Sequence, residues 1–199
     1  MSPKPLAVLD ANVLYTFVQR GFFLFCATEG LYDPLWSQEI VEEATHHLVK
    51  NAVMTPARAN RLTENLRRYF PEAWGHGFAG NPIAGTLPDE GDRHVIDLAV
   101  HYEADYIVTS NIGDFPACVL TPYAIEAVKP DRFAEILCDR DMEAVFRAAE
   151  EHRCSMTKSL PDTGDYLASL RSHGGVGSAV DRLTAVGFVA GARLCDALP

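Results

Sequence analysis

The sequence has no hydrophobic run long enough to cross a membrane. Its most apolar stretch, residues 21–27 (GFFLFCA), is far shorter than the roughly 20 residues that a membrane-spanning helix needs. The N-terminus also lacks the longer apolar stretch and the small-residue cleavage site of a secretory signal peptide. We therefore expect a cytoplasmic protein that does not associate with a membrane.

Cysteine is scarce and scattered. The five cysteines occur singly, without a CxxC pair: Cys26, Cys118, Cys138, Cys154 and Cys195. An odd number of isolated cysteines is not typical of a disulfide framework or of a zinc site. The pattern fits a reducing compartment in which most thiols are small buried side chains.

Positive charge is also in short supply. The 199 residues include 17 Lys and Arg against 27 Asp and Glu, which gives a formal net charge of −10. This balance disfavours a protein that holds nucleic acid by bulk positive charge, because its general field repels phosphate. Hydrophobic residues make up 48% and charged residues 22%, as in soluble globular proteins, and the length suits one domain with a small extension.

What the sequence does contain is an alternation of short apolar runs and helical patterns. Strands are predicted over residues 6–9, 106–109 and 125–128, and helices over residues 12–26, 38–50, 57–69, 89–102 and 130–138. Such alternation predicts an α/β fold, a three-layer α/β/α domain with a mainly parallel sheet. Only helices are predicted after residue 138, so we expect a domain over residues 1–138 and a helical extension over residues 139–199.

Acidic and amide side chains follow two of the predicted strands. Asp10 comes directly after the first strand, and Asn111 and Asp114 lie in the loop after the strand at 106–109. Ligands of an open parallel sheet bind beyond the carboxyl ends of its strands. Each acid taken singly could equally be an ordinary loop or cap residue.

Two helices add further carboxylates. In the helix over residues 38–50, Glu43 lies on the border of the apolar face, whereas Glu39 and Glu42 point toward solvent. Asp92 shares a face with the apolar residues that follow it at helical spacing. Asp89 is either the N-cap of that helix or one more acid of the same group.

Four carboxylates at one sheet edge would repel one another unless a cation lay between them. Oxygen-only ligands suit Mg²⁺ or Mn²⁺, which keep several waters and bind phosphate oxygens well. Such ions support phosphodiester hydrolysis by activating a water molecule and stabilising the leaving oxygen. The acids therefore predict a metal-dependent phosphodiesterase.

Four sequence blocks in this order resemble the PIN-domain family, and most of all the VapC toxins of bacterial type II toxin–antitoxin systems. They are DANVL at 10–14, SQEIVEEATHHL at 37–48, PDEGDRHVIDLA at 88–99 and TSNIGDFP at 109–116. The resemblance covers about residues 5–138. It implies a Mg²⁺- or Mn²⁺-dependent endoribonuclease with an RNA substrate and a cognate antitoxin protein as partner, and it allows a homodimer.

The resemblance also implies site residues. Asp10, Glu43, Asp92 and Asp114 match the family's acidic quartet, and the flanking polar positions are matched by Asn12, Asp89, Thr109 and Asn111. Many relatives carry an acid where this chain has Asn111. The fourth ligand is therefore either Asp114 alone or Asp114 together with Asn111.

Arginines lie between the acidic blocks. Arg61 and Arg68 are seven residues apart and share one helix face, with Arg58 beside them, and Arg93 stands next to Asp92. They form either an RNA-backbone contact strip or a solvated surface, since arginine pairs well with phosphate. His94 as a general base is a minor hypothesis, and His46 and His47 are expected at the surface.

Two other functions stay open at this point. The same chemistry could serve RNA processing without a toxin role. Alternatively, the domain could be a non-catalytic module whose acidic cleft binds an arginine-rich partner.

Overall fold

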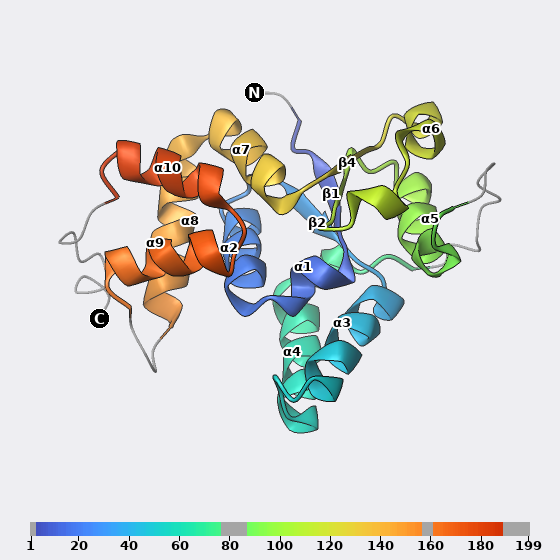
Figure 1. The fold of residues 1–199 in the computed structure, drawn as a ribbon, viewed down its shortest axis with the longest axis horizontal. Helices are drawn as coiled ribbons and strands as arrows, with labels where there is room; N and C mark the ends of the chain where they lie inside the picture. The colour runs from blue at the N-terminus through green and yellow to red at the C-terminus, as the bar shows by residue number, and fades with distance from the viewer. Residues whose placement is uncertain (1–2, 77–86, 157–160, 189–199) are drawn as a thin grey trace. The chain divides into compact units, whose positions relative to one another are not determined.

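The computed structural model describes residues 3–76, 87–156 and 161–188, and it contains a four-stranded parallel sheet (Figure 1). The strands are β1 (Leu6–Leu9), β2 (Asp33–Leu35), β3 (Tyr106–Val108) and β4 (Glu126–Val128), in the order β2-β1-β3-β4. Every neighbouring pair is parallel. The expected α/β class, a three-layer α/β/α fold with a mainly parallel sheet, is confirmed.

Helices occupy most of the remaining described chain. They are α1 (Ala11–Tyr15), α2 (Phe17–Thr28), α3 (Gln38–Lys50), α4 (Pro56–Tyr69), α5 (Arg93–His101), α6 (Ala117–Leu120), α7 (Pro130–Arg140), α8 (Met142–Ser155), α9 (Thr163–Ser172) and α10 (Gly177–Ala185). Short 3-10 turns cover Pro71–Ala73, Glu90–Asp92, Ile112–Asp114 and Thr121–Tyr123. In the part of the chain described, no helix combines the length and the apolar character that crossing a bilayer requires.

The chain divides into two compact units. The first unit contains the described parts of residues 1–15 and 33–129, and the second those of residues 16–32 and 130–199. The division therefore falls at Pro130, and α2 joins the C-terminal helices. The expected boundary between residues 138 and 139 rests on the change to a helices-only pattern in the sequence and stays a prediction about the extent of the first domain.

The register of the sheet positions the site. Leu9 at the end of β1 pairs with Val108 at the end of β3, and the pairing is extended by a hydrogen bond from the Asp10 amide to the Val108 carbonyl at 3.1 Å. Leu9 and Val108 are both fully buried. Asp10 and Thr109 therefore leave the sheet side by side, beyond its carboxyl edge.

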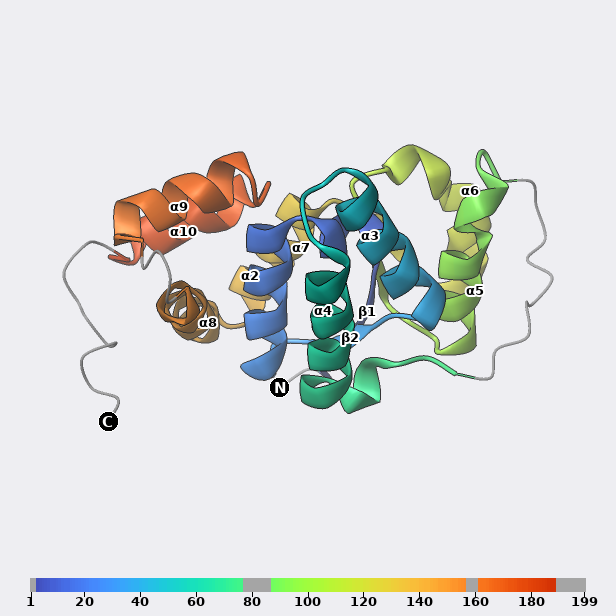
Figure 2. The same ribbon diagram turned by 90° about the horizontal axis from the view of Figure 1, so that it is seen from below.

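Two helical features complete the first unit around the site. The Ser37 hydroxyl accepts a hydrogen bond from the Ile40 amide and caps α3, and α3 then contacts both α1 and α4. Figure 2 shows α3 and α4 running beside each other. Helix α5 packs on β1 and β3, which brings the loop before it to the same edge of the sheet.

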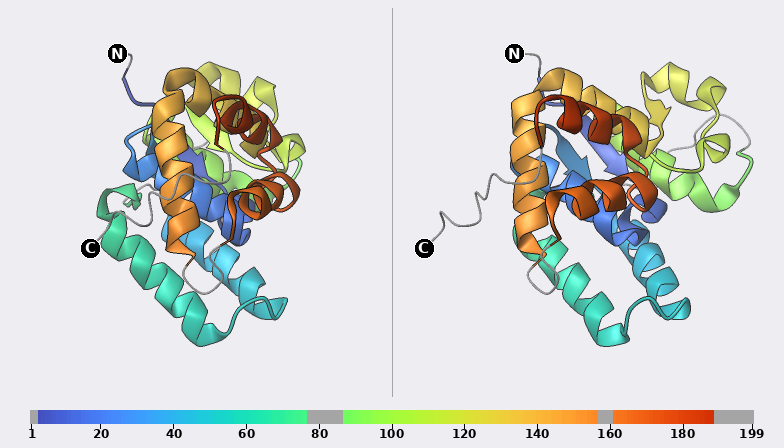
Figure 3. Two further views of the ribbon diagram at one scale, coloured as in Figure 1. Left: turned by 90° about the vertical axis from the view of Figure 1, so that its left-hand side faces the viewer. Right: turned by 60° about the vertical axis from the view of Figure 1, so that its left-hand side comes forward.

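The second unit is a cluster of helices (Figure 3). Helix α2 packs against α8, and α10 contacts both α7 and α9. Phe22 and Phe23 of α2 are fully buried, and the rings of Phe23 and Phe133 lie 5.6 Å apart. The apolar face of α2 is thus buried by residues that come more than a hundred positions later.

Several local expectations are corrected. The single helix expected over residues 12–26 is two helices, because the backbone becomes extended at Thr16. The helix expected from residue 89 begins at Arg93, after a 3-10 turn that Asp89 caps. Cys154 is disulfide-bonded, contrary to the cysteine pattern, although Cys26, Cys118 and Cys138 are free thiols. Strand β2 was not among the strands expected from the sequence.

Candidate active site

Asp10 is held rigidly at the carboxyl edge of the sheet. Its Oδ1 accepts a hydrogen bond from the Ala11 amide at 2.6 Å, and its Oδ2 accepts from the Thr109 hydroxyl at 2.7 Å and from Asn12 Nδ2 at 2.5 Å. Thr109 is fully buried. Burial raises the pKa of Asp10, although these donors oppose the rise.

Asn12 and Asn111 make hydrogen bonds to the residues that follow β3, next to the end of β1. Asn12 donates to Thr109 Oγ1 at 3.0 Å and accepts from the Ser110 amide at 3.0 Å. Asn111 contributes its backbone, whose amide donates to Thr109 Oγ1 at 3.0 Å, while its side chain is exposed. These polar residues thus orient Asp10 and the loop that leads to Asp114.

Asp92 shows that the predicted acids act on one another. Partial burial and the negative charges of Asp10, Asp114, Asp89 and Glu43 raise its pKa from 3.8 to about 6. Burial and Asp10 likewise raise the pKa of Glu43. The structure therefore brings the whole predicted quartet into one electrostatic cluster.

The structure shows Glu43 partly exposed on its helix, as expected, and Asp89 in its expected capping role. The Glu43 side chain is 42% exposed, whereas Glu39 and Glu42 lie at the surface, and Gln38 donates to Glu42. Asp89 is exposed and accepts from the Gly91 amide at 2.8 Å, so it caps the turn before α5. Asp89 nevertheless raises the pKa of Asp92, so both readings of this residue apply.

His94 lies among these acids. Its Nδ1 donates to the Gly91 carbonyl at 2.7 Å, and its Nε2 stands 3.9 Å from Glu43 Oε2. Nε2 is buried and has no hydrogen-bond partner in the described part of the chain. Sequence reasoning gave this histidine little weight, although its position two residues after Asp92 placed it beside the site.

The candidate RNA-binding arginines have different environments. Arg93 is bound by Glu90 through two hydrogen bonds of 2.7 and 3.0 Å. Arg58, Arg61 and Arg68 are exposed on α4, and none forms an ion pair within residues 3–76, 87–156 and 161–188. The α4 arginines are therefore better placed to contact phosphate than Arg93.

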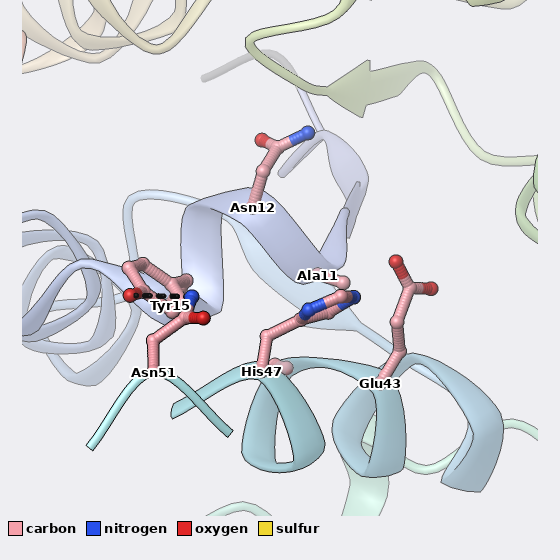
Figure 4. Close-up of a pocket in the computed structure, with 7 residues that line it drawn as sticks. Ala11, Asn12, Tyr15, Glu43, His47 and Asn51 are labelled. Carbon is pink, nitrogen blue, oxygen red and sulfur yellow. Dashed lines mark hydrogen bonds between the residues drawn. The ribbon is translucent and has the colours of Figure 1, made fainter. Parts of the chain in front are cut away.

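A pocket of about 250 Å³ opens beside Glu43, between α1 and α3 (Figure 4). It is lined by Ala11, Asn12, Tyr15, Glu43, Ala44, His47 and Asn51. Sequence reasoning missed Tyr15 and Asn51 and treated His47 as a plain surface residue. The spacing of four between Glu43, His47 and Asn51, which places them on one helix face, was the available signal.

The donor chemistry of the cluster fits Mg²⁺ or Mn²⁺, because all of its carboxylates offer hard oxygen ligands. Within the described residues, no three Asp, Glu, His or Cys side chains lie close enough together to hold one ion. Mg²⁺ does not require such a group, because it is usually bound by one or two carboxylates with waters and phosphate oxygens. A divalent cation bound at this edge would relieve the repulsion among the negative charges around Asp92, and this relief favours its binding.

A family model described as PIN domain matches residues 7–113, which is more than half of the chain. The chain belongs to the PIN-domain family. The matched region of this PIN domain contains Asp10, Glu43 and Asp92 and ends one residue before Asp114.

A relative was also found among curated proteins. Over 42 residues the PIN-domain chain is 50% identical to the Mycobacterium tuberculosis protein named "Putative ribonuclease VapC50". The matched segment is 21% of this chain and 25% of the relative, so the match spans about a quarter of that protein's length. No solved structure matched the chain significantly.

Proposed function

We propose that this protein is a Mg²⁺- or Mn²⁺-dependent endoribonuclease and the toxin of a toxin–antitoxin pair, acting on RNA in the cytoplasm. The observation that carries the proposal is the environment of Asp92, whose pKa is raised to about 6 by burial and by four neighbouring carboxylates. Like charges gathered at the carboxyl edge of a parallel sheet are costly without a cation. Family membership and the short match to a VapC-named protein support the same conclusion.

Asp10, Glu43, Asp92 and Asp114 would hold the cation, directly or through water. When bound, the cation supplies an activated water and positive charge next to the phosphate. Thr109 and Asn12 fix the direction of the Asp10 carboxylate through the hydrogen bonds at 2.7 and 2.5 Å. A carboxylate oriented in this way before substrate binds need not reorganise during the reaction.

The reaction we propose is hydrolysis of one phosphodiester bond. Water oxygen bonds to phosphorus, the bond to one ribose oxygen breaks, and that oxygen takes up a proton. The exposed arginines of α4 would contact neighbouring phosphates, since guanidinium groups pair well with phosphate oxygens. Phosphate contacts of this kind position RNA without reading its sequence.

The test is cleavage of total cellular RNA with Mg²⁺ or Mn²⁺, followed by mapping of the new ends. We expect cleavage that EDTA abolishes and that Glu43→Gln and Asp92→Asn each lower by at least about 100-fold, since a cation at such a site contributes several kcal/mol. Glu39→Gln is the matched control, because Glu39 lies on the same helix but faces solvent. Undiminished cleavage by Asp92→Asn would contradict the proposal.

Expression in a bacterial host tests the toxin role separately. Growth arrest that is lost with Asp92→Asn and relieved by a co-expressed antitoxin protein is the expected result. Cleavage without growth arrest would indicate an RNA-processing nuclease. If the protein does not cleave RNA and calorimetry shows no Mn²⁺ binding, the result would indicate a non-catalytic module with an acidic surface.

A further inference from the structure

The pocket between α1 and α3 adjoins the acidic cluster through one shared side chain. Glu43 lines the pocket and is itself one of the four acids of the cluster, and Ala11 and Asn12, which also line it, both donate hydrogen bonds to Asp10. Figure 4 shows Glu43 and His47 rising from α3, and Asn51 from the residue just after it, toward α1, with Tyr15 at the opposite end of the pocket from Glu43. A group bound here would lie next to the reacting phosphate.

The volume of the pocket limits what it can hold. At about 250 Å³ it is smaller than the roughly 300–1,000 Å³ of pockets that enclose drug-sized ligands. It is nevertheless several times larger than the roughly 30 Å³ that one water molecule occupies in the liquid. The space suits a single planar ring system.

The lining offers both features by which proteins hold an unpaired base. Tyr15 and His47 supply flat rings, and base stacking on aromatic side chains is the usual mode for single-stranded RNA. Asn51 carries a carboxamide that both donates and accepts hydrogen bonds, as the edge of a base requires. Asn51 Nδ2 donates to the Tyr15 hydroxyl at 3.3 Å, a long bond that a better-placed acceptor can replace.

We propose that this pocket binds one unpaired nucleobase of the RNA beside the scissile phosphate and so selects the cleavage site. The inference rests on the proposed ribonuclease function, because Glu43 connects the two sites. His47 stacks on the base and Asn51 reads its edge. Phosphate contacts carry no sequence information, so base selection needs a pocket of this kind.

The first test maps cleavage of a single-stranded RNA library with randomised sequence. Wild type should prefer one or two bases at a fixed position next to the cut, and His47→Ala and Asn51→Ala should each weaken that preference about tenfold, in line with the loss of a stacking or edge contact. His46→Ala is the matched control, because His46 is the neighbouring exposed histidine on α3 and does not line the pocket. Its base preference should equal that of wild type.

The second test does not depend on cleavage. The four ribonucleoside 5′-monophosphates are titrated into metal-free wild-type protein while backbone amide signals of residues 11–15 and 43–51 are followed by NMR. One or two nucleotides should shift these signals selectively, and His47→Ala should weaken that binding about tenfold. Shifts that are absent or equal for all four nucleotides would overturn the inference.

The two proposals fail in different ways. If wild type does not cleave RNA at all, the ribonuclease proposal fails, and the nucleotide titration still decides whether the pocket binds a base. If wild type cleaves RNA and both pocket variants keep its base preference, the pocket inference fails and the ribonuclease proposal stands.

Discussion

The negative charge of Asp92 is unfavourable in the metal-free protein. Its pKa of about 6 in the folded state exceeds the ordinary 3.8, so the folded protein binds more protons than the unfolded chain between these values. Stability therefore falls as pH rises from about 4 to 6, and the full penalty is present above pH 6. Asp92 thus lowers stability at neutral pH.

We expect Asp92→Asn to stabilise the metal-free protein at pH 8 by about 1 kcal/mol, a figure reduced for the solvent screening of a half-exposed group. The gain should be much smaller near pH 4, where Asp92 is protonated in the folded state and partly protonated in the unfolded chain. Urea unfolding in EDTA at the two pH values measures it. Asp181→Asn, which alters an exposed acid paired with Arg171, should give no such pH-dependent gain, and an equal effect at both pH values would contradict the argument.

Thr109 acts on catalysis through Asp10. We expect Thr109→Val, which keeps the shape and removes the hydroxyl, to lower the cleavage rate about 10- to 100-fold, as for other residues that orient metal-binding groups. Thr109→Ser should restore most of the rate because it returns the donor to Asp10 Oδ2. Metal-dependent RNA cleavage measures both variants, with circular dichroism as the check on folding. A Val variant as active as wild type would show that this hydrogen bond is dispensable.

The sequence predicted the carboxylates better than the pocket beside them. Asp10 and Asp92 could be placed because strand ends and helix faces follow from short-range spacing. The contact between Tyr15 and Asn51 could not be predicted, because it depends on how α1 packs on α3, which no local pattern specifies. The roles of all these residues stay predictions until the variants are measured.

At the scale of the element, α3 was predictable and the N-terminal helix was not. Ser37 and the apolar spacing gave residues 38–50, and the observed helix is Gln38–Lys50. The break at Thr16 has no glycine or proline to signal it. Strand β2 was missed because its middle residue is Pro34, which a strand tolerates only at an edge such as this one.

The cap of α3 also sets the position of Glu43. We expect Ser37→Ala to lower the free energy of unfolding by about 1 kcal/mol, because the buried Ile40 amide loses its acceptor. Thr55→Ala at the start of α4 is the matched control, since its side chain makes no cap hydrogen bond. It should cost clearly less in the same urea titration. Equal losses would mean that the Ser37 cap contributes nothing specific.

For the whole molecule, the net charge of −10 at first argued against a nucleic-acid partner. Part of that charge is the acidic cluster itself, whose local sign a bound divalent cation would invert. A few exposed arginines would then make the contacts with the RNA phosphates. The excess of acidic over basic residues therefore predicts weak, metal-dependent RNA binding and not tight binding through overall positive charge.

We expect Arg61→Ala and Arg68→Ala to weaken RNA binding by the cleavage-deficient Asp92→Asn protein. Each should also reduce the slope of log K against log salt by about 0.7, the value for one lost phosphate contact on a single strand. Fluorescence anisotropy over a salt series measures this. Arg182→Ala, which alters an arginine paired with Asp139, is the control and should keep the slope. An unchanged slope in the α4 variants would identify the strip as ordinary solvated surface.

The second compact unit has a consequence for how the chain folds as it is made. Helix α2 packs on α8, whose first residue, Met142, comes more than a hundred residues after Thr28. During synthesis from the N-terminus, Phe23 must therefore leave the ribosome well before α8 and before Phe133 of α7, whose ring lies 5.6 Å from its own. A nascent chain in this state exposes an apolar helix, which makes it a target for chaperones until its last helices emerge.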